Sequence, residues 1–136
     1  MAALAVVLTT QTLTCWRWFL LLSVRLCLRA APLVLVRLHK DFFDFSQAQG
    51  NGEDVRFSTS SGTPLAYQIE ELDAAKGTAS IWVRIPTIKG NERQEIKVHW
   101  GKADAASESD GKAVFNESNG YLSVWHMTGP VKDEVG

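Results

Sequence analysis

Three histidines are the first residues of this sequence whose type could support metal binding or acid–base chemistry. They are His39, His99 and His126. A zinc site needs three or four ligands that converge in space, and the sequence contains no His-x-x-x-His or Cys-x-x-Cys spacing. We therefore expect the histidines to lie on strand surfaces, and we expect no metal and no other cofactor.

The carboxylates come in clusters along the chain, namely Glu53-Asp54, Glu70-Glu71 with Asp73, and Asp133-Glu134. A glycosidase needs two carboxyl groups about 5–10 Å apart across a substrate cleft. Neighbouring residues of a regular strand point to opposite faces, so none of these clusters is visibly arranged for that reaction. The sequence also lacks a calcium loop, a serine elbow and a phosphate loop. We expect a protein that is not an enzyme.

Two side chains are candidates for ligand binding, and four others are expected to support the structure. Trp82 lies on the face of its strand opposite the apolar residues, next to Arg84. An exposed Trp at this position could stack on a sugar or a partner protein, whereas a covered one would belong to the core; both interpretations stay open. Glu70 ends a strand and could pair with Arg56 or Arg84. The four structural residues are Arg56, Glu70, Trp100 and Trp125.

The elements that must position these side chains have the pattern of antiparallel β-structure. Alternation of apolar and polar residues with a period of two indicates a strand with one buried face. It occurs at 34–39, 65–70, 79–85 and 95–100. Turn-forming residues separate these segments, and we expect 86–93, with its Gly-Asn pair, to join the last two strands as a hairpin. The spacing of the strands favours a sandwich or barrel.

The predicted fold class is mainly β: an antiparallel β-sandwich, either complete or incomplete, with an N-terminal apolar helical segment. Residues 113–127 indicate the start of a further unit, ending in a strand over 121–127 for which no partner follows. An opening strand without a partner leaves unpaired backbone groups. We therefore expect the chain to be a fragment that is truncated on its C-terminal side.

The first 31 residues differ in character from the rest. Residues 1–40 carry five basic and no acidic residues, whereas the remainder carries 9 basic and 15 acidic ones, which argues against a nucleic-acid surface. The segment Leu13–Leu28 is mostly apolar but is interrupted by Arg17 and Arg25. Three interpretations stay open: a degenerate signal peptide or signal-anchor, a wrongly assigned start, and a buried helix of the fold.

Six motifs, in this order, resemble those of the bacterial domain-of-unknown-function family 2341 (DUF2341). They are Val36–His39, Phe43–Phe45, Gly52–Phe57, Leu65–Glu70, Trp82–Pro86 and His99–Gly101. Several matching blocks in order are more specific than any one alone. The resemblance covers residues 33–105. It departs at residues 99–102, where many members have Tyr-Tyr-Gly-Asn and this chain has His-Trp-Gly-Lys.

The resemblance implies a domain organisation. Family members often carry a laminin-G or concanavalin-A-like lectin domain immediately afterwards, and residues 113–127 resemble the lead-in to one. We thus expect a signal-like, anchor-like or spurious segment at 1–31 and a DUF2341-like β domain at 32–105. A linker and the truncated start of a lectin-like domain would follow at 106–136. In the family a strand precedes the first motif, and since residues 1–31 do not resemble it, the sheet should lack an edge partner near Val34–Leu38.

The resemblance also implies a function. We expect a noncatalytic β module of a bacterial cell-envelope or secreted protein, with a spacer or adhesion role beside a lectin-like carbohydrate-binding domain. Its partners would be glycans or surface proteins, bound through that missing adjacent domain, with a membrane tether at Leu13–Leu28 and no nucleic acid. Two alternatives stay open: a periplasmic accessory domain of a biopolymer-transport proton-channel protein, and a fragment of a polysaccharide-active enzyme.

Overall fold

The computed structural model describes residues 2–8, 31–126 and 133–135, and there the protein is mainly β. Its strands form a four-stranded and a three-stranded antiparallel sheet, accompanied by the short helix α1 (Gly111–Val114). The predicted mainly β, antiparallel architecture is thus confirmed. The predicted N-terminal helical segment falls largely on residues 9–30, outside the described residues. The described residues before residue 9 form strand β1 (Ala2–Leu8) instead.

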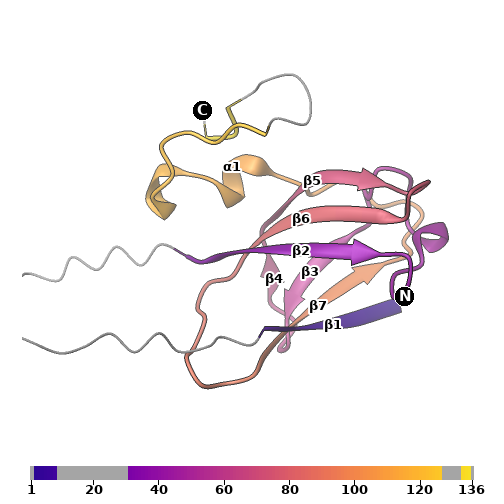
Figure 1. Ribbon diagram of the computed structural model, residues 1–136, viewed down its shortest axis with the longest axis horizontal. Coiled ribbons are helices and arrows are strands. Elements are labelled where there is room, and N and C mark those ends of the chain that lie inside the picture. Colours follow the sequence, from indigo (N-terminus) through magenta and orange to yellow (C-terminus); the bar gives the residue numbers. More distant parts are fainter. Residues whose placement is uncertain (1, 9–30, 127–132, 136) are drawn as a thin grey trace, which may run out of the picture.

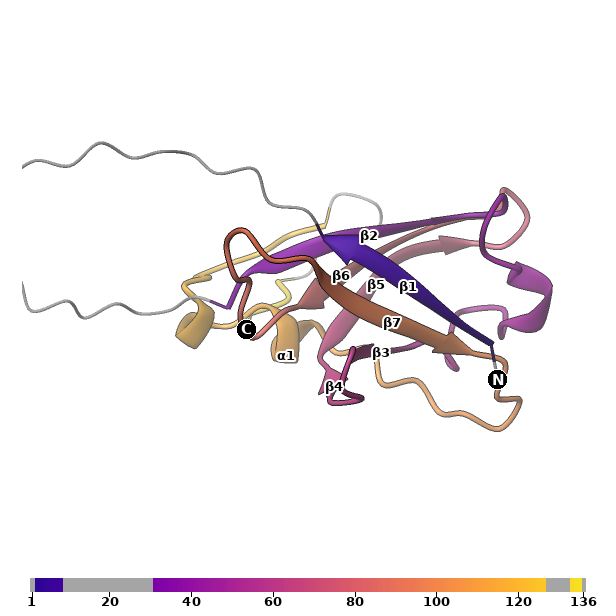
Figure 2. The ribbon, with the colours of Figure 1, turned by 90° about the horizontal axis from the view of Figure 1, so that it is seen from below.

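The two sheets lie as two layers (Figures 1 and 2). The first has the strand order β1-β7-β3-β4, with β7 (Gln94–Trp100) between β1 and β3 (Arg56–Thr59), and the two-residue strand β4 (Pro64–Leu65) at the edge. The second sheet has the order β2-β6-β5. Its strands are β2 (Leu33–His39), β6 (Thr78–Arg84) and β5 (Tyr67–Asp73).

The inner faces of both sheets share one hydrophobic core. Alternate residues are buried, as the period-two pattern predicted: Ile81 and Val83 in β6 and Val98 in β7 are 0 % exposed. The rings of Phe57 in β3 and Tyr67 in β5 meet across the sheets with their centroids 5.4 Å apart. Burial of one such large apolar side chain contributes about 1.5–3 kcal/mol, so this shared core is what holds the two layers together.

The predicted hairpin over 86–93 is wrong. Strands β6 and β7 lie in different sheets, so residues 86–93 carry the chain from one layer to the other. The hairpin is instead β5–β6, closed by a bond from the Gly77 N–H to the Asp73 carbonyl at 2.8 Å. Gly77 has φ +71°, and a Cβ there would lie 2.7 Å from Lys40 Cβ. Alternation reveals a strand but not its partner, because pairing depends on residues far away in the sequence.

The chain also changes sheets within the segment predicted as one strand over 65–70. Leu65 pairs with Phe57 in the first sheet, whereas Tyr67 pairs with Val83 in the second. Ala66 stands at the crossing, and its carbonyl accepts from the Arg84 N–H at 2.9 Å. The alternation continues across the crossing because both strands present their apolar residues to the same core.

The edges of the second sheet differ from each other. Within the described residues β2 pairs with β6 alone, and β1 joins the other sheet. The expected lack of an edge partner near Val34–Leu38 stays a prediction, because residues 9–30 lie outside the described ranges. The β5 edge is covered. The Asp110 N–H donates to the Tyr67 carbonyl at 3.0 Å, and the Ser109 hydroxyl accepts from the Ile69 N–H at 2.9 Å.

Residues 109–126 continue over the β5 side of the second sheet (Figure 1). Helix α1 follows Asp110, whose carboxylate caps its first backbone N–H groups, and a 3-10 turn at Glu117–Asn119 comes next. The strand predicted over 121–127 is not formed in its described part, 121–126. In the described residues an isolated bridge joins Trp125 to Asp133, with the Glu134 N–H donating to the Val124 carbonyl at 2.9 Å. The Asp133 carboxylate accepts from the Val124 N–H at 3.1 Å.

Candidate functional site

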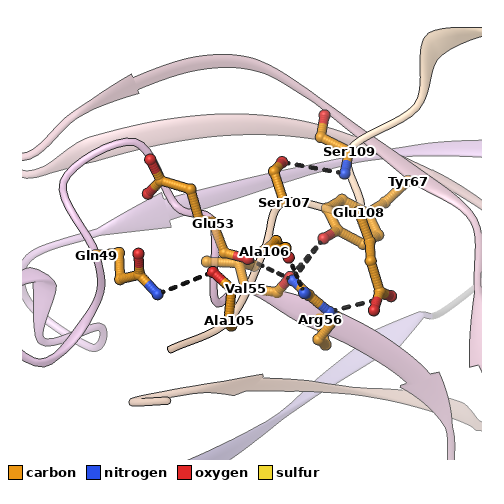
Figure 3. Close-up of polar contacts among 10 residues, drawn as sticks. All are labelled: Gln49, Glu53, Val55, Arg56, Tyr67, Ala105, Ala106, Ser107, Glu108 and Ser109. Atoms are coloured by element: carbon orange, nitrogen blue, oxygen red, sulfur yellow. Dashed lines mark hydrogen bonds and ion pairs between the residues drawn. The ribbon is translucent and has the colours of Figure 1, made fainter. Parts of the chain in front are cut away.

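Arg56, at the start of β3, ties the loop at 104–109 to both sheets (Figure 3). Its Nη1 donates to the Glu53 carbonyl at 2.7 Å and to the Tyr67 hydroxyl at 3.0 Å. Its Nη2 donates to the Ala106 carbonyl, and its Nε lies 3.1 Å from Glu108 Oε2. A planar guanidinium with several donors suits this fan of acceptors, so the side chain is held in one orientation.

The Tyr67 hydroxyl completes this arrangement. It donates to the Val55 carbonyl at 2.6 Å while it accepts from Arg56. Burial raises the pKa of the Tyr67 phenol, and the opposing effect of the Arg56 charge is smaller. The phenol therefore stays protonated and remains a donor over the whole neutral range.

A cavity of about 280 Å³ lies beside Arg56. It is lined by Asp54, Arg56, His99, Trp100, Lys102, Asp104, Ala105, Ala106 and Glu108. The Asp54 carboxylate accepts from the backbone N–H groups of Gln49 at 2.8 Å and Gly101 at 2.6 Å, which holds the end of β7 against the start of β3.

Three polar groups of this cavity have no internal partner. Within the described residues, the side chains of Lys102 and Asp104 make no hydrogen bond or ion pair. The Trp100 Nε1–H is buried and is the single buried side-chain nitrogen or oxygen in the described part of the chain without a hydrogen-bond partner. Native structures leave few such groups unpaired, so the cavity has binding capacity that the fold itself does not use.

A second cavity, of about 410 Å³, adjoins the first and shares Arg56, His99 and Glu108 with it. Its other lining residues are Phe57, Ser58, Gly62, Pro64, Leu65, Tyr67 and Lys97. Here the Ser58 hydroxyl lies 2.9 Å from His99 Nε2, a contact that a serine nucleophile and its base would also make. Among the described residues no carboxylate hydrogen-bonds to the His99 ring, so the third member of a catalytic triad is not in place.

The outer face of the second sheet carries a separate group of side chains, the Glu70 cluster, made of Gln68, Glu70, Trp82, Phe115 and His126. Trp82 Nε1 donates to Glu70 Oε2 at 2.9 Å, and His126 Nδ1 lies 3.2 Å from Glu70 Oε1. His126 Nε2 lies 3.3 Å from Gln68 Oε1. The Phe115 ring packs against the rings of Trp82 and His126 at 6.0 and 5.7 Å. These contacts fasten residues 113–126 to the sheet.

A β-bulge explains the position of Glu70. The register of β5 against β6 shifts between Ile69 and Glu71, so Glu70 is the extra residue of the bulge. Bulges redirect side chains, and here the Glu70 carboxylate reaches Trp82 on the outer face, whereas Glu71 pairs with Ser80. The rule that neighbouring strand residues point to opposite faces does not hold at this position.

The predicted binding residues Trp82 and Arg84 lie on this outer face, and the C-terminal segment covers them. Trp82 is half-buried under Phe115, which is neither the exposed position nor the core position that the sequence left open. Arg84 Nη1 donates to the Ala113 carbonyl at 2.9 Å. Glu70 binds Trp82 and His126 instead of Arg56 or Arg84.

The structure places the two other tryptophans differently. Trp100 is 7 % exposed and packs against Phe43 in the core, with the ring centroids 4.6 Å apart. Trp125 is 55 % exposed on the C-terminal segment. Local sequence patterns did not point to Gln68, Glu108 or Ser58, and His126 was expected only as a surface histidine. Their partners lie 41 to 58 residues away in the sequence, and no local pattern marks them.

Two further properties concern membranes and metals. No helix within residues 2–8, 31–126 and 133–135 is long and apolar enough to cross a membrane. The predicted tether at Leu13–Leu28 lies outside these residues. Within the same ranges, no group of three or more His, Cys, Asp or Glu side chains is placed to hold a metal ion.

Comparison with known proteins gives one match. A family model described as a domain of unknown function (DUF2341) matches residues 51–123, more than half of the chain. No curated protein and no solved structure matches the chain. The matched segment contains Arg56, Glu70 and Trp82 and ends just before His126. The lectin-like lead-in at 113–127 stays a prediction.

Proposed function

Because the chain belongs to the DUF2341 family, whose description assigns no activity, we propose its function from the site itself: a noncatalytic β-sandwich module of a bacterial cell-envelope or secreted protein, with a spacer or adhesion role. One observation carries this proposal. The polar side chains that sequence and structure single out are engaged in fastening loops to the sheets. A module that transmits force or displays a neighbouring domain needs such fixed connections.

The Arg56 contacts support this role. The guanidinium joins the sheets to residues 106 and 108 through a carbonyl and a carboxylate. Its Nη1 group, with two N–H donors, is directed to oxygens of residues 53, 55 and 67. An arginine whose donors are used inside the fold contributes rigidity. It is less suited to an electrophilic role in catalysis, for which free donors must face a substrate.

The Glu70 cluster supports the same role at the other face. A carboxylate that serves as general acid, base or nucleophile must reach a substrate in a cleft. Glu70 is 22 % exposed and already accepts from Trp82 and lies beside His126. Its contacts hold residues 113–126, which in a longer chain would lead to the following domain. We propose a laminin-G- or concanavalin-A-like lectin domain at that place.

The adhesion role predicts binding that can be measured with the whole chain. The purified protein is incubated with immobilised bacterial and host polysaccharides and with intact cell envelopes, and bound protein is quantified. We expect retention on at least one of these surfaces and no release of reducing sugars. If the protein is retained on none of these surfaces, the adhesion role is refuted. Release of reducing sugars that disappears in the His99→Ala variant would overturn the noncatalytic assignment and favour the polysaccharide-active alternative.

A further inference from the structure

We propose that the two adjoining cavities beside Arg56, together called the Arg56 groove, bind a neutral saccharide. The groove lies on the four-stranded sheet and the loop at 102–108, away from the Glu70 cluster. This inference rests on the proposed adhesion role and assigns part of it to the DUF2341 domain itself. The family resemblance had instead implied glycan binding by a neighbouring lectin-like domain.

The size and continuity of the groove suit a small ligand with several hydroxyl groups. The cavities measure about 280 and 410 Å³ and share Arg56, His99 and Glu108, so they lie next to each other on either side of these three residues. Small-molecule sites have volumes of about 300–1,000 Å³. The groove is therefore large enough for a short saccharide, and it crosses the Arg56–Glu108 ion pair at its middle.

The charges that line the groove favour a neutral ligand. Three cationic side chains, Arg56, Lys97 and Lys102, face three anionic ones, Asp54, Asp104 and Glu108. Their formal charges cancel. A polyanion or a polycation would meet as much repulsion as attraction, because each like-charge contact opposes a favourable one. A neutral ligand has no such conflict.

The free hydrogen-bonding groups of the groove suit a ligand with hydroxyl groups. Lys102 offers donors and Asp104 offers acceptors, and both side chains are exposed and lack partners in the described part of the chain. A hydroxyl group both donates and accepts, so vicinal hydroxyls can satisfy such a mixed pair. Trp100 lines the groove next to them, but its unpaired indole N–H is buried from solvent. The second cavity also has apolar lining, from Phe57, Pro64 and Leu65, and the peptide library of the test therefore measures whether a peptide binds instead.

The fixed position of Arg56 prepares the groove for binding. Its donors are held by oxygens of residues 53, 55, 67 and 106, as Figure 3 shows. Glu108 is held in turn, with Oε2 on Arg56 Nε. A side chain that is already ordered loses little entropy on binding. The ligand would thus meet a preformed centre at Arg56 and Glu108 and two adjustable side chains, Lys102 and Asp104, in the first cavity.

The test compares a groove variant with a matched surface variant. Lys102→Ala with Asp104→Ala removes one cation and one anion that have no partners, so the fold should be unaffected. Lys112→Ala with Glu117→Ala removes the same charges on the C-terminal segment, where both side chains are exposed and form no hydrogen bond or ion pair with the described residues. The probes are neutral tetrasaccharides of glucose and of N-acetylglucosamine. An oligogalacturonate, a chitosan oligomer and a mixed peptide library are assayed in parallel.

Binding is measured by calorimetry and by the shift of the Trp100 indole N–H resonance. We expect a neutral tetrasaccharide to bind and to shift that resonance. The groove variant should bind about tenfold more weakly, the effect of losing one or two hydrogen bonds, and the surface variant should bind like the wild type. Unchanged affinity in the groove variant, or binding of only a charged oligomer or a peptide, overturns the inference. If envelopes or polysaccharides retain the groove variant fully, the adhesion role stands without this groove; if they do not retain even the wild type, both proposals fail.

Discussion

Replacement of Arg56 by alanine should destabilise the protein strongly, although the residue lies at the start of β3 beside a cavity. The side chain is only 24 % exposed. Its Nη1 and Nη2 groups donate to neutral oxygens on Glu53, Val55, Tyr67 and Ala106. Nη1 has two N–H groups for three of these oxygens, so three N–H groups donate in all, and at about 0.5–1.5 kcal/mol for each they amount to about 1.5–4.5 kcal/mol. The ion pair with Glu108 adds little, because that carboxylate is 67 % exposed.

Water will replace part of these contacts in the variant, since the cavity admits solvent. We therefore expect the free energy of unfolding to fall by about 2–4 kcal/mol, a large share of the about 5–15 kcal/mol that stabilises a typical domain. Arg56→Lys should also be destabilising, because one ammonium group cannot span the same acceptors.

Urea unfolding followed by tryptophan fluorescence measures the effect. Arg93→Ala is the matched control, since Arg93 is 69 % exposed and pairs only with Glu95; we expect a change within about 0.5 kcal/mol. Hydrogen exchange should show that residues 104–109 lose protection first in Arg56→Ala. If Arg56→Ala unfolds at the same urea concentration as Arg93→Ala, Arg56 does not hold this loop and the reasoning is refuted.

Three further predictions concern other parts of the chain. Gly77→Ala should lower the free energy of unfolding by about 1–3 kcal/mol, because φ is +71° and a Cβ would lie 2.7 Å from a neighbouring side chain; Gly90→Ala, with open space, should be nearly neutral in the same urea titration. Glu70→Ala should raise hydrogen exchange in residues 113–126 while β6 stays protected; equal exchange in both regions would show that the Glu70 cluster does not hold this segment. The Ser123 hydroxyl and two backbone N–H groups lower the pKa of Asp133. Its contribution to stability is therefore present above the unfolded pKa, near 4, and is lost as the pH falls through the lower folded pKa. In the Asp133→Asn variant the free energy of unfolding should therefore fall less at acid pH than in the wild type. An unchanged pH dependence of that free energy would contradict the assignment.

The strands were largely predictable from local alternation, and the reason is physical. In a sheet with one buried face, every second residue must be apolar. The apolar residues Ile81 and Val83, at every second position, therefore predict strand β6 without knowledge of the strands that pair with it. The same reasoning failed at Glu70. A bulge inserts one residue and changes which face the following side chains occupy, and nothing in the local sequence marks that insertion.

The candidate sites were predictable only as residue types. Arg56, Glu70 and Trp82 stood out as polar or aromatic residues within apolar strands. Their partners did not, because Glu108 and His126 reach them from 52 and 56 residues away in the sequence. The free groups at Lys102, Trp100 and Asp104 become a candidate ligand site only after β7 and β3 are paired and the following loop folds back over them.

The sequence by itself determined the mainly β class, the faces that are buried and the family to which the chain belongs, because periodicity and ordered motifs are local properties of the chain. Only the tertiary structure decided which strands pair, where the chain crosses between sheets and which polar groups meet. Those outcomes depend on the closure of two layers around one core, and the energy of that closure comes from contacts between residues that the sequence keeps far apart.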